Sequence, residues 1–362
     1  MQLSKTDIIK IISILKGIAI SLVVFLHWDG RTDFNSETFN QVSLFLSPLR
    51  MPVFIFASGF LYFYITKSRY PEYSKFILEK GKRLLIPLLS IKLLYFFIKF
   101  VAGSVLTHDF VMVETGIKSF IVDLFVYPAS SLYAGFLWFV YTLFFVFAIV
   151  HLLSSNYKIL LIVSAIVFFI PLPQEFCLDR IGEYLFFFAL GGVPFNYLPV
   201  IKITKRTIPA LFIVLISSIG VIALLYSAYS EYYLIDRFLQ LVRYTGGILF
   251  VLSLSVLLAK SDNMTARVLA YIGTFSASIY FLHTIACRVF AVIGNQLVHI
   301  GSEFAFWVYL FFAMLVGIIV PILLDKYFFS KSYLAGFLIL GKKPDRANPK
   351  AIICNLNYWR LG

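Results

Sequence analysis

The chain has 362 residues, of which 60% are hydrophobic and only 14% are charged, and its net charge at pH 7 is +13. A soluble domain averages about 45–50% apolar and about 25% charged residues, so this composition excludes a secreted soluble enzyme, a DNA-binding protein and a disordered chain. The apolar residues suffice for about ten membrane helices of ~20 residues each, which indicates a polytopic membrane protein.

Apolar runs bounded by charged residues, Pro or Gly predict ten membrane-spanning helices, with ends good to several residues. In chain order they lie at 8–27, 42–66, 84–102, 133–153, 158–173, 181–199, 208–229, 238–259, 271–298 and 304–325. The first run has no small-residue cleavage site after it, and we interpret it as a retained span rather than a signal peptide. The stretch 110–128 is apolar but carries Glu114, Lys118 and Asp123, which indicates an interfacial or re-entrant segment.

The Lys and Arg residues of the connecting segments are unevenly divided between the two sides of this pattern. Twenty-one fall on one side, and four fall on the other: Arg31, Lys118, Arg180 and Arg237. Because Lys and Arg accumulate on the cytoplasmic side of membrane helices, both termini are predicted to be cytoplasmic, which requires an even number of spans. The predicted fold class is all-α, a polytopic membrane helix bundle of about ten transmembrane helices. Residues 1–330 would form the membrane domain, and residues 331–362 a short basic cytoplasmic tail.

Several ionisable residues lie within predicted spans, where their cost makes each a functional candidate. Lys92 and Lys99 favour a simpler interpretation, in which they snorkel toward an interface. Lys16 differs because it sits in the middle of an apolar first helix, eleven residues before His27. At about 100° and 1.5 Å per residue, both side chains project from one face, roughly 16 Å apart. The alternative is a structural Lys paired with a carboxylate and an interfacial His.

The three Cys are far apart, so neither a metal site nor a disulfide framework is predicted.

Six ordered segments carry a family resemblance. They are Lys16-Gly17-Ile18-Ala19 leading to His27, Met51–Phe60 closing in Ser58-Gly59-Phe60, Lys80-Gly81-Lys82-Arg83, Leu137-Trp138-Phe139, Gly182-Glu183-Tyr184, and Gly273-x-x-Ser276 leading to Ile279-Tyr280-x-x-His283. Together they resemble the acyltransferase-3 family, the integral-membrane O-acyltransferases of bacterial surface polysaccharides. The Lys-Gly start looks most like its fucose 4-O-acetylase branch. Where the family often has Arg-x-x-Arg, this chain has Lys80-x-x-Arg83, which keeps the charge but loses one guanidinium.

The resemblance implies the transfer of an acyl group to a sugar hydroxyl, a reaction that needs a base because the hydroxyl's own pKa is far above 7. His27 suits that catalytic role, either as the base or as the carrier of an acyl-His intermediate. Lys16, Lys80, Lys82 and Arg83 are predicted to lie toward the cytoplasm and to bind the phosphates of the acyl-CoA donor. For Lys80, Lys82 and Arg83 a positive-inside anchor is an equal alternative.

The remaining candidates are predicted to support the acceptor or the catalytic residue. Gly273, Ser276, Tyr280 and His283 are spaced to line one helix face, and His283 would orient a partner or satisfy a buried hydrogen bond. Trp138 and Tyr184 would stack on a sugar ring or simply pack at the interface, and Glu183 would pair with His27 or with a buried Lys. His27 itself is expected near the outer face of the membrane.

The predicted function is therefore a multi-pass O-acyltransferase of the bacterial inner membrane. It would use acetyl-CoA, or another acyl-CoA, as a donor substrate without any bound cofactor or metal. Its acceptor would be a lipid-linked or polymeric glycan such as O-antigen, capsule or exopolysaccharide, and no nucleic acid is expected as a partner. The alternatives are a glycan flippase or small-molecule transporter, which would predict paired broken helices in two related halves, and a polysaccharide polymerase, which would carry a large external loop.

Overall fold

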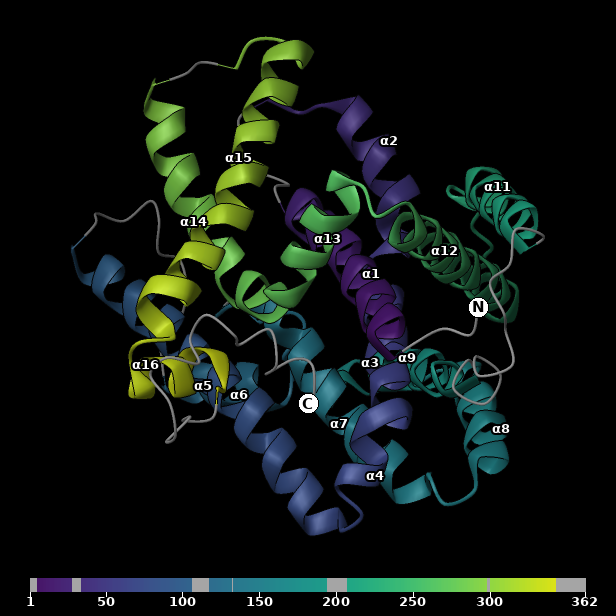
Figure 1. Ribbon diagram of the computed structural model, residues 1–362. Coiled ribbons are helices and arrows are strands. Elements are labelled where there is room, and N and C mark those ends of the chain that lie inside the picture. Colours follow the sequence, from purple (N-terminus) through teal and green to yellow (C-terminus); the bar gives the residue numbers. More distant parts are fainter. Residues whose placement is uncertain are drawn as a thin grey trace. The chain divides into compact units, whose positions relative to one another are not determined.

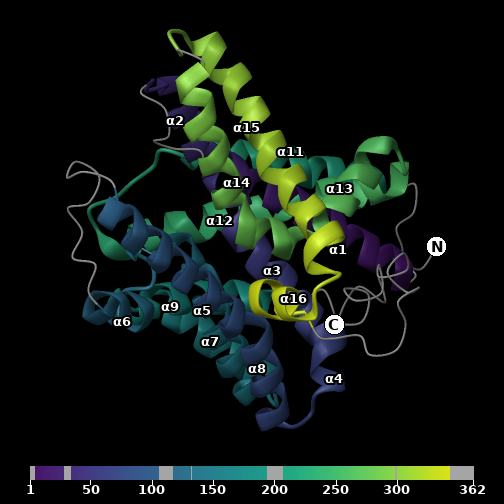
Figure 2. The same cartoon turned by 90° about the vertical axis from the view of Figure 1, so that its left-hand side faces the viewer.

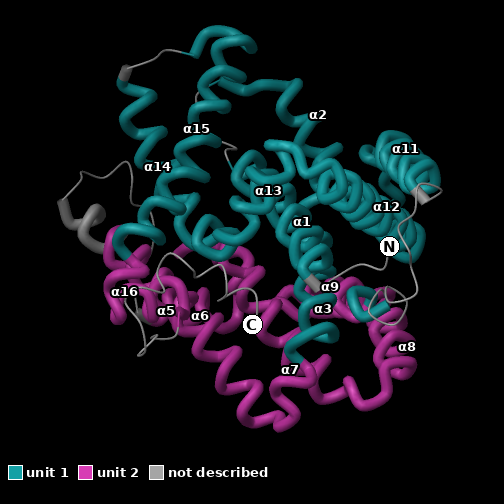
Figure 3. The backbone as a smooth tube through the Cα atoms, viewed as in Figure 1, with its two compact units in different colours: residues 1–66, 190–328, 348–362 teal, residues 67–189, 329–347 magenta. Residues whose placement is uncertain are grey.

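The computed structural model describes residues 5–27, 34–105, 117–131, 133–193, 207–297 and 300–342. These residues are predominantly helical, and no strand occurs among them (Figure 1). The chain divides into two compact units, coloured separately in Figure 3. Unit 1 comprises residues 1–66, 190–328 and 348–362, and unit 2 comprises residues 67–189 and 329–347.

Unit 1 contains the two ends of the predicted membrane region. Its helices are α1 (Lys5–Leu26), α2 (Glu37–Leu46), a 3₁₀ turn (Ser47–Leu49), α3 (Met51–Leu61), a π-helical turn (Tyr62–Thr66), α11 (Thr207–Leu225), α12 (Tyr233–Ser261), α13 (Met264–Thr274), α14 (Ser276–Leu297) and α15 (Glu303–Leu324). A second π-helical turn, Asp325–Phe329, continues α15. The central helix α1 packs against α3, α12, α13, α14 and α15, and α14 and α15 run side by side (Figures 1 and 2).

Unit 2 is built on a contact between two long helices. Its elements are α4 (Lys67–Arg69), α5 (Tyr73–Val105), α6 (Ile117–Phe125), a 3₁₀ turn (Gly135–Leu137), α7 (Trp138–Leu153), α8 (Tyr157–Phe168), a second 3₁₀ turn (Glu175–Cys177), α9 (Leu178–Leu190) and α16 (Tyr333–Leu340). Helix α5 packs against α7, and α16 packs against α5. Gly341 ends α16 with φ +62°, the left-handed conformation that favours Gly, and a Cβ added there would lie 2.5 Å from the carbonyl oxygen of Arg83.

Polar residues at helix starts explain where many of these helices begin. Each side chain accepts a hydrogen bond from the backbone N–H three residues later, which satisfies a donor that the first helical turn leaves unpaired. The capping residues are Ser36 of α2, Asn156 of α8, Asn263 of α13, Ser302 of α15 and Ser332 of α16.

Seven of the described helices are long and apolar enough to cross a membrane, by length and composition. They are Thr6–Leu26, Glu37–Arg69, Gly135–Leu153, Ile208–Leu225, Tyr233–Ser261, Ser276–Gln296 and Glu303–Phe329. The predicted all-α polytopic membrane bundle is confirmed. The total of ten spans and the cytoplasmic position of both termini stay predictions. Residues 194–199 of the predicted span 181–199 and residues 110–116 of the segment 110–128 lie outside the described residues.

The predicted ninth span, 271–298, is wrong at its start. The chain forms two helices there, α13 and α14, separated at Phe275, whose backbone leaves the helical region (φ −99°, ψ 11°). The Thr274 hydroxyl donates to the Tyr271 carbonyl at 2.6 Å, and such local bonding competes with the backbone ladder of a continuing helix. Gly273 therefore belongs to α13 and does not share a helix face with Ser276, Tyr280 and His283.

The predicted snorkelling of Lys92 is also wrong. The side chain is 0% exposed within unit 2, and its Nζ donates to the backbone carbonyl of Asp123 at 3.0 Å. The Asp123 carboxylate accepts in turn from the Ser131 hydroxyl at 3.3 Å. A buried ammonium needs hydrogen-bond acceptors, and the last turn of α6 supplies one that the sequence does not reveal. The side chain of Lys99 lies outside the described residues.

Two glycines let α1 and α13 cross with their backbones in contact. A Cβ placed on Gly17 would meet the Leu269 carbonyl oxygen, and one placed on Gly273 would meet the Ser13 carbonyl oxygen and lie 2.9 Å from the backbone nitrogen of Gly17. The obstructing atoms are backbone atoms, which cannot rotate away as a side chain does. Both glycines belong to the motifs singled out in the sequence, and their role is close helix packing.

Gly273→Ala is therefore expected to lower the free energy of unfolding of the purified protein by about 1–3 kcal/mol, the usual cost of overpacking a close-packed interior. The measurement is the thermal midpoint in detergent. Gly220→Ala in α11 is the matched control, because nothing lies within 4 Å of an added Cβ there. Equal thermal midpoints for the two variants would contradict the proposed backbone contact.

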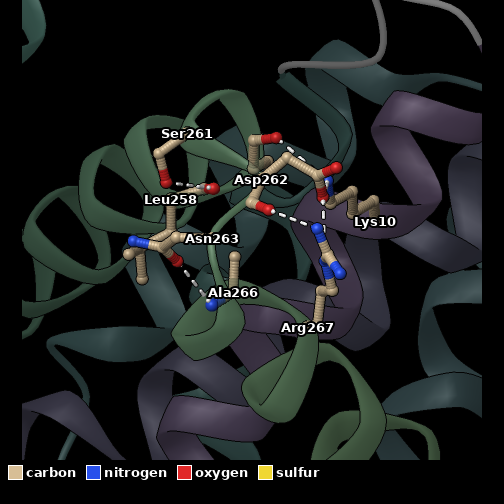
Figure 4. A network of polar contacts seen from close by, with 8 residues as sticks. Lys10, Leu258, Ser261, Asp262, Asn263, Ala266 and Arg267 are labelled. Atoms are coloured by element: carbon tan, nitrogen blue, oxygen red, sulfur yellow. Dashed lines mark hydrogen bonds and ion pairs between the residues drawn. The ribbon is translucent and has the colours of Figure 1, made fainter.

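A polar network joins the start of α1 to the connection between α12 and α13 (Figure 4). The Nζ atom of Lys10 donates to the Ala259 carbonyl at 3.1 Å and to the Asp262 carboxylate at 2.6 Å. Arg267 lies 3.9 Å from the same carboxylate and donates to the Asp262 backbone carbonyl at 3.2 Å. The hydrogen bond from Lys10, followed by the charges of Lys10 and Arg267, lowers the pKa of Asp262 below its usual value.

This network predicts a pH dependence of stability. Because the folded-state pKa of Asp262 is lowered, its contribution is complete above the unfolded-chain pKa of about 4 and is lost as pH falls through the folded-state value. Asp262→Asn should therefore lower the thermal midpoint at pH 7, and the difference from wild type should shrink on acidification below about pH 4. The exposed pair Lys75–Glu72 offers the control Glu72→Gln, for which a smaller difference is expected at either pH. A difference for Asp262→Asn that stays constant with pH would contradict this role.

Candidate active site

His27 directly follows the last residue of α1, and its ring folds back along that helix. The Nδ1 atom lies 2.8 Å from the Val23 carbonyl oxygen. A carbonyl oxygen only accepts, so Nδ1 carries the proton and donates, which leaves the lone pair of the neutral imidazole on Nε2. The local helix geometry thus orients a nitrogen base at the carboxyl end of α1.

A second histidine, His283 of α14, contacts the ring of His27. The two ring centroids are 5.0 Å apart, and the ring planes meet at 79°, an edge-to-face arrangement. His283 is 0% exposed. Its Nδ1 lies 2.9 Å from the Ile279 carbonyl oxygen and 2.8 Å from that of Tyr280, so it too carries its proton on Nδ1. The Thr284 hydroxyl lies 3.4 Å from Nε2. The structure therefore brings together two residues that are 256 positions apart in the printed sequence.

The end of α1 that carries His27 packs against α14 and α15. A Cβ placed on Gly317 of α15 would lie 2.7 Å both from Val24 of α1 and from the Sγ atom of Cys287 in α14. Gly317 follows Glu303, the first residue of α15, by fourteen residues, about 21 Å at 1.5 Å per residue. The apolar helix Glu303–Phe329 has 27 residues and is long enough to span a bilayer. Phe25, two residues before His27, packs on Trp307 near the start of the same helix, and the position of His27 near the outer face stays a prediction.

Aromatic rings surround the carboxyl end of α1. Phe25 packs on Phe39 of α2 at 5.3 Å and on Trp307 of α15 at 6.2 Å between centroids, and Phe39 packs on Phe306 at 5.6 Å. The hydroxyl of Ser36, which caps α2, donates to the Glu303 carboxylate at 2.7 Å and so ties the starts of α2 and α15 together. Phe25, Phe39 and Phe306 are buried. The apolar surroundings strengthen electrostatic interactions near His27.

Tyr280 and Ser276 remain on α14 with His283, as predicted, and both are buried. The Tyr280 ring lies 6.1 Å from the His283 ring.

Sequence reasoning missed a second buried pair on this helix, in which the Ser278 hydroxyl donates to the Asp325 carboxylate. Asp325 is 2% exposed and begins the π-helical turn after α15. Its position at the end of a long apolar run was the available signal, because a carboxylate there is unfavourable for the helix dipole unless a partner satisfies it.

Lys16 lies on α1 with a half-buried side chain, directly before the glycine that contacts α13. It is separated from His27 by three turns of the same helix, as the spacing predicted.

The predicted donor-binding cations of unit 2 occupy different environments on α5. The Nζ atom of Lys80 lies 4.0 Å from the centre of the Phe147 ring and 5.6 Å from that of Phe76, so its ammonium is engaged in cation–π contacts within the α5–α7 interface. Lys82 is exposed, and Arg83 is half-buried. All three lie inside α5, which begins at Tyr73, rather than at the entry to the predicted span 84–102.

Trp138 and Tyr184 are brought together in unit 2. Their rings stack at 5.7 Å with planes 25° apart, and the guanidinium of Arg180 lies 5.2 Å from the Trp138 ring centre. The Glu183 carboxylate is buried and lies 3.9 Å from the guanidinium of Arg180, one helical turn earlier on α9. Arg180 was predicted only as an external loop residue, and its spacing before Glu183 and Tyr184 was the available signal.

Among the described residues no group of three or more His, Cys, Asp or Glu side chains is arranged to hold a metal ion.

A family model described as an acyltransferase domain matches residues 9–326, nearly the whole chain. Comparison with curated proteins and with solved structures gave no match.

Proposed function

The chain belongs to the acyltransferase family whose domain it contains, and we propose that it transfers an acetyl group from cytoplasmic acetyl-CoA to a sugar hydroxyl of a bacterial surface glycan. The predicted resemblance to the acyltransferase-3 family is confirmed, and the protein is a membrane acyltransferase with several long apolar helices. The donor, the acceptor, the inner-membrane location and the fucose acetylase-like branch are parts of the proposal.

One observation supports the chemistry most strongly: the Nδ1–H of His27 donates a hydrogen bond to the Val23 carbonyl oxygen. In the proposed reaction Nε2 accepts the proton of the sugar hydroxyl as its oxygen attacks the thioester carbonyl. The new C–O ester bond forms, the C–S bond breaks, and the departing CoA sulfur takes the proton back from the imidazolium. A fixed tautomer is an advantage here, since it leaves a basic nitrogen for the hydroxyl without prior rearrangement.

The donor path follows α1 in this proposal. Lys16 lies three turns before His27, about 16 Å along the helix, which is comparable to the length of an extended pantetheine arm. Its charge suits a CoA phosphate or the polarised thioester region, and the exposed Lys82 suits a phosphate. Lys80, held between aromatic rings, fits a structural role better than a direct donor contact.

Trp138 and Tyr184 of unit 2 are the candidates for contact with a sugar. A sugar ring packs on aromatic faces through its C–H groups and hydrogen-bonds through its hydroxyls. The stacked pair Trp138 and Tyr184, with Arg180 and Glu183 beside it, supplies both kinds of contact.

Glycan NMR tests this function. Polysaccharide from a strain lacking the gene should have lost one O-acetyl group per repeat, and the wild-type gene should restore it. Unacetylated glycan of normal amount and length would support transfer. Glycan that keeps every O-acetyl group but no longer reaches the cell surface would instead favour the flippase alternative.

A further inference from the structure

His27 and His283 share one hydrogen-bonding pattern. In each residue Nδ1 donates to the backbone about one turn earlier in the chain. His27 donates to the carbonyl oxygen of Val23. His283 donates to the carbonyl oxygens of Ile279 and Tyr280. A histidine whose Nδ1 proton is held in this way presents Nε2 as its basic nitrogen. The two rings then meet edge to face at 5.0 Å.

The two residues differ in burial and in support. His283 is fully buried in the middle of a helical turn, and its ring is held by two backbone carbonyls with the Thr284 hydroxyl near Nε2. His27 is half-buried, and it follows the last residue of its helix. A side chain at a helix end has more freedom than one within it, because the flanking turn is missing on one side. The fully buried ring of His283 therefore constrains the half-buried ring of His27.

We propose that His283 is the positioning residue of His27: its ring fixes the orientation of the His27 imidazole and thereby keeps the Nδ1 proton on the Val23 carbonyl. This inference rests on the proposed function, in which Nε2 of His27 is the base. A rotation of the His27 ring by half a turn about its Cβ–Cγ bond would exchange Nδ1 with a carbon and break the hydrogen bond to Val23. The edge-to-face contact with His283 opposes that rotation.

A neutral ring at position 283 also suits the charge that His27 acquires. When Nε2 of His27 takes the hydroxyl proton, the imidazolium lies against an aromatic ring, and a cation gains from such contact. A second aromatic ring, that of Tyr280, lies 6.1 Å from the His283 ring. The requirement is for a ring at this position rather than for its nitrogens.

The test compares His283→Phe, which keeps a ring, with His283→Gln, which keeps a polar chain and loses the ring. Acetyl transfer by His283→Phe should stay within about fivefold of wild type. Transfer by His283→Gln should fall about 10²-fold in kcat with a KM for acetyl-CoA within twofold, as expected when a reacting group is misplaced by about 1 Å. The matched control is His151→Gln, because His151 of α7 also stacks on an aromatic ring, that of Phe76, at 4.1 Å. Rates for His283→Phe as low as those for His283→Gln, at equal folded protein, would overturn the proposal.

A second readout does not depend on activity. The chain contains five His, so ¹⁵N-histidine labelling gives a short spectrum that single substitutions assign. The ring nitrogens of His27 should report one tautomer, with the proton on Nδ1, in wild type and in His283→Phe, and mixed tautomers in His283→Gln. An unchanged His27 spectrum in His283→Gln would overturn the proposal. The predicted spectra in a protein that transfers no acetyl group would support the coupling of the two rings and reject the proposed function alone.

Discussion

Replacing His27 with Ala is expected to abolish acetyl transfer while the amount of folded protein in the membrane stays near the wild-type level. Loss of a positioned general base reduces rates by about 10²–10⁴-fold. The structural loss is small by comparison. The hydrogen bond from Nδ1 to the Val23 carbonyl contributes about 0.5–1.5 kcal/mol, and His27 lies beyond the last residue of α1. The measurement is the rate of acetyl transfer per mole of purified, monodisperse protein.

His151→Ala serves as the control for the removal of an imidazole from a membrane helix. That ring stacks on Phe76 in unit 2, and nothing in the proposed mechanism uses it. We expect near-normal transfer from this variant. Substantial product from His27→Ala at normal abundance would remove His27 from the catalytic role.

Lys16→Met is expected to weaken the use of acetyl-CoA sharply, with a rise of about 10-fold or more in KM, whereas Lys16→Arg keeps much of the activity. A charge-assisted hydrogen bond to a phosphate or a thioester oxygen explains the difference, since Arg preserves the charge and Met does not. A Lys near mid-membrane costs ~2.5–3.5 kcal/mol on insertion scales, so Lys16→Met should insert at least as well as wild type. The KM for acetyl-CoA and the membrane abundance are measured together.

Lys10→Met is the matched control on the same helix. Lys10 donates to Ala259 and Asp262, so its loss should lower the thermal midpoint and leave the KM for acetyl-CoA unchanged. If Lys16→Met lowered abundance but bound acetyl-CoA normally, the donor-binding role would be wrong and Lys16 would be structural.

Hydropathy identified most of the helices correctly because each of them coincides with one long apolar run of the sequence. The ranges 8–27, 208–229, 238–259 and 304–325 each overlap one helix closely. Hydropathy could not divide 271–298, since both halves are apolar and the break depends on local bonding at Thr274 and Phe275. It also could not foresee the buried acceptor of Lys92, which is a backbone carbonyl 31 residues further along the chain.

The site was predictable as a set of residues but not as an arrangement. His27 and His283 were both candidates, yet their contact depends on where α1 ends relative to α14, which no local pattern encodes. The cation–π contacts of Lys80 likewise depend on which face of α5 meets α7.

The central claim is that this protein transfers an acyl group from CoA to a sugar hydroxyl with His27 as the base. The most direct measurement incubates purified protein with acetyl-CoA labelled in the acetyl group and a membrane extract of lipid-linked glycan, and then follows the label by mass spectrometry. The account predicts label in an ester of the glycan with wild-type protein and none with His27→Ala. Label that remains entirely in acetyl-CoA with folded wild-type protein, or equal glycan labelling by both proteins, would contradict it.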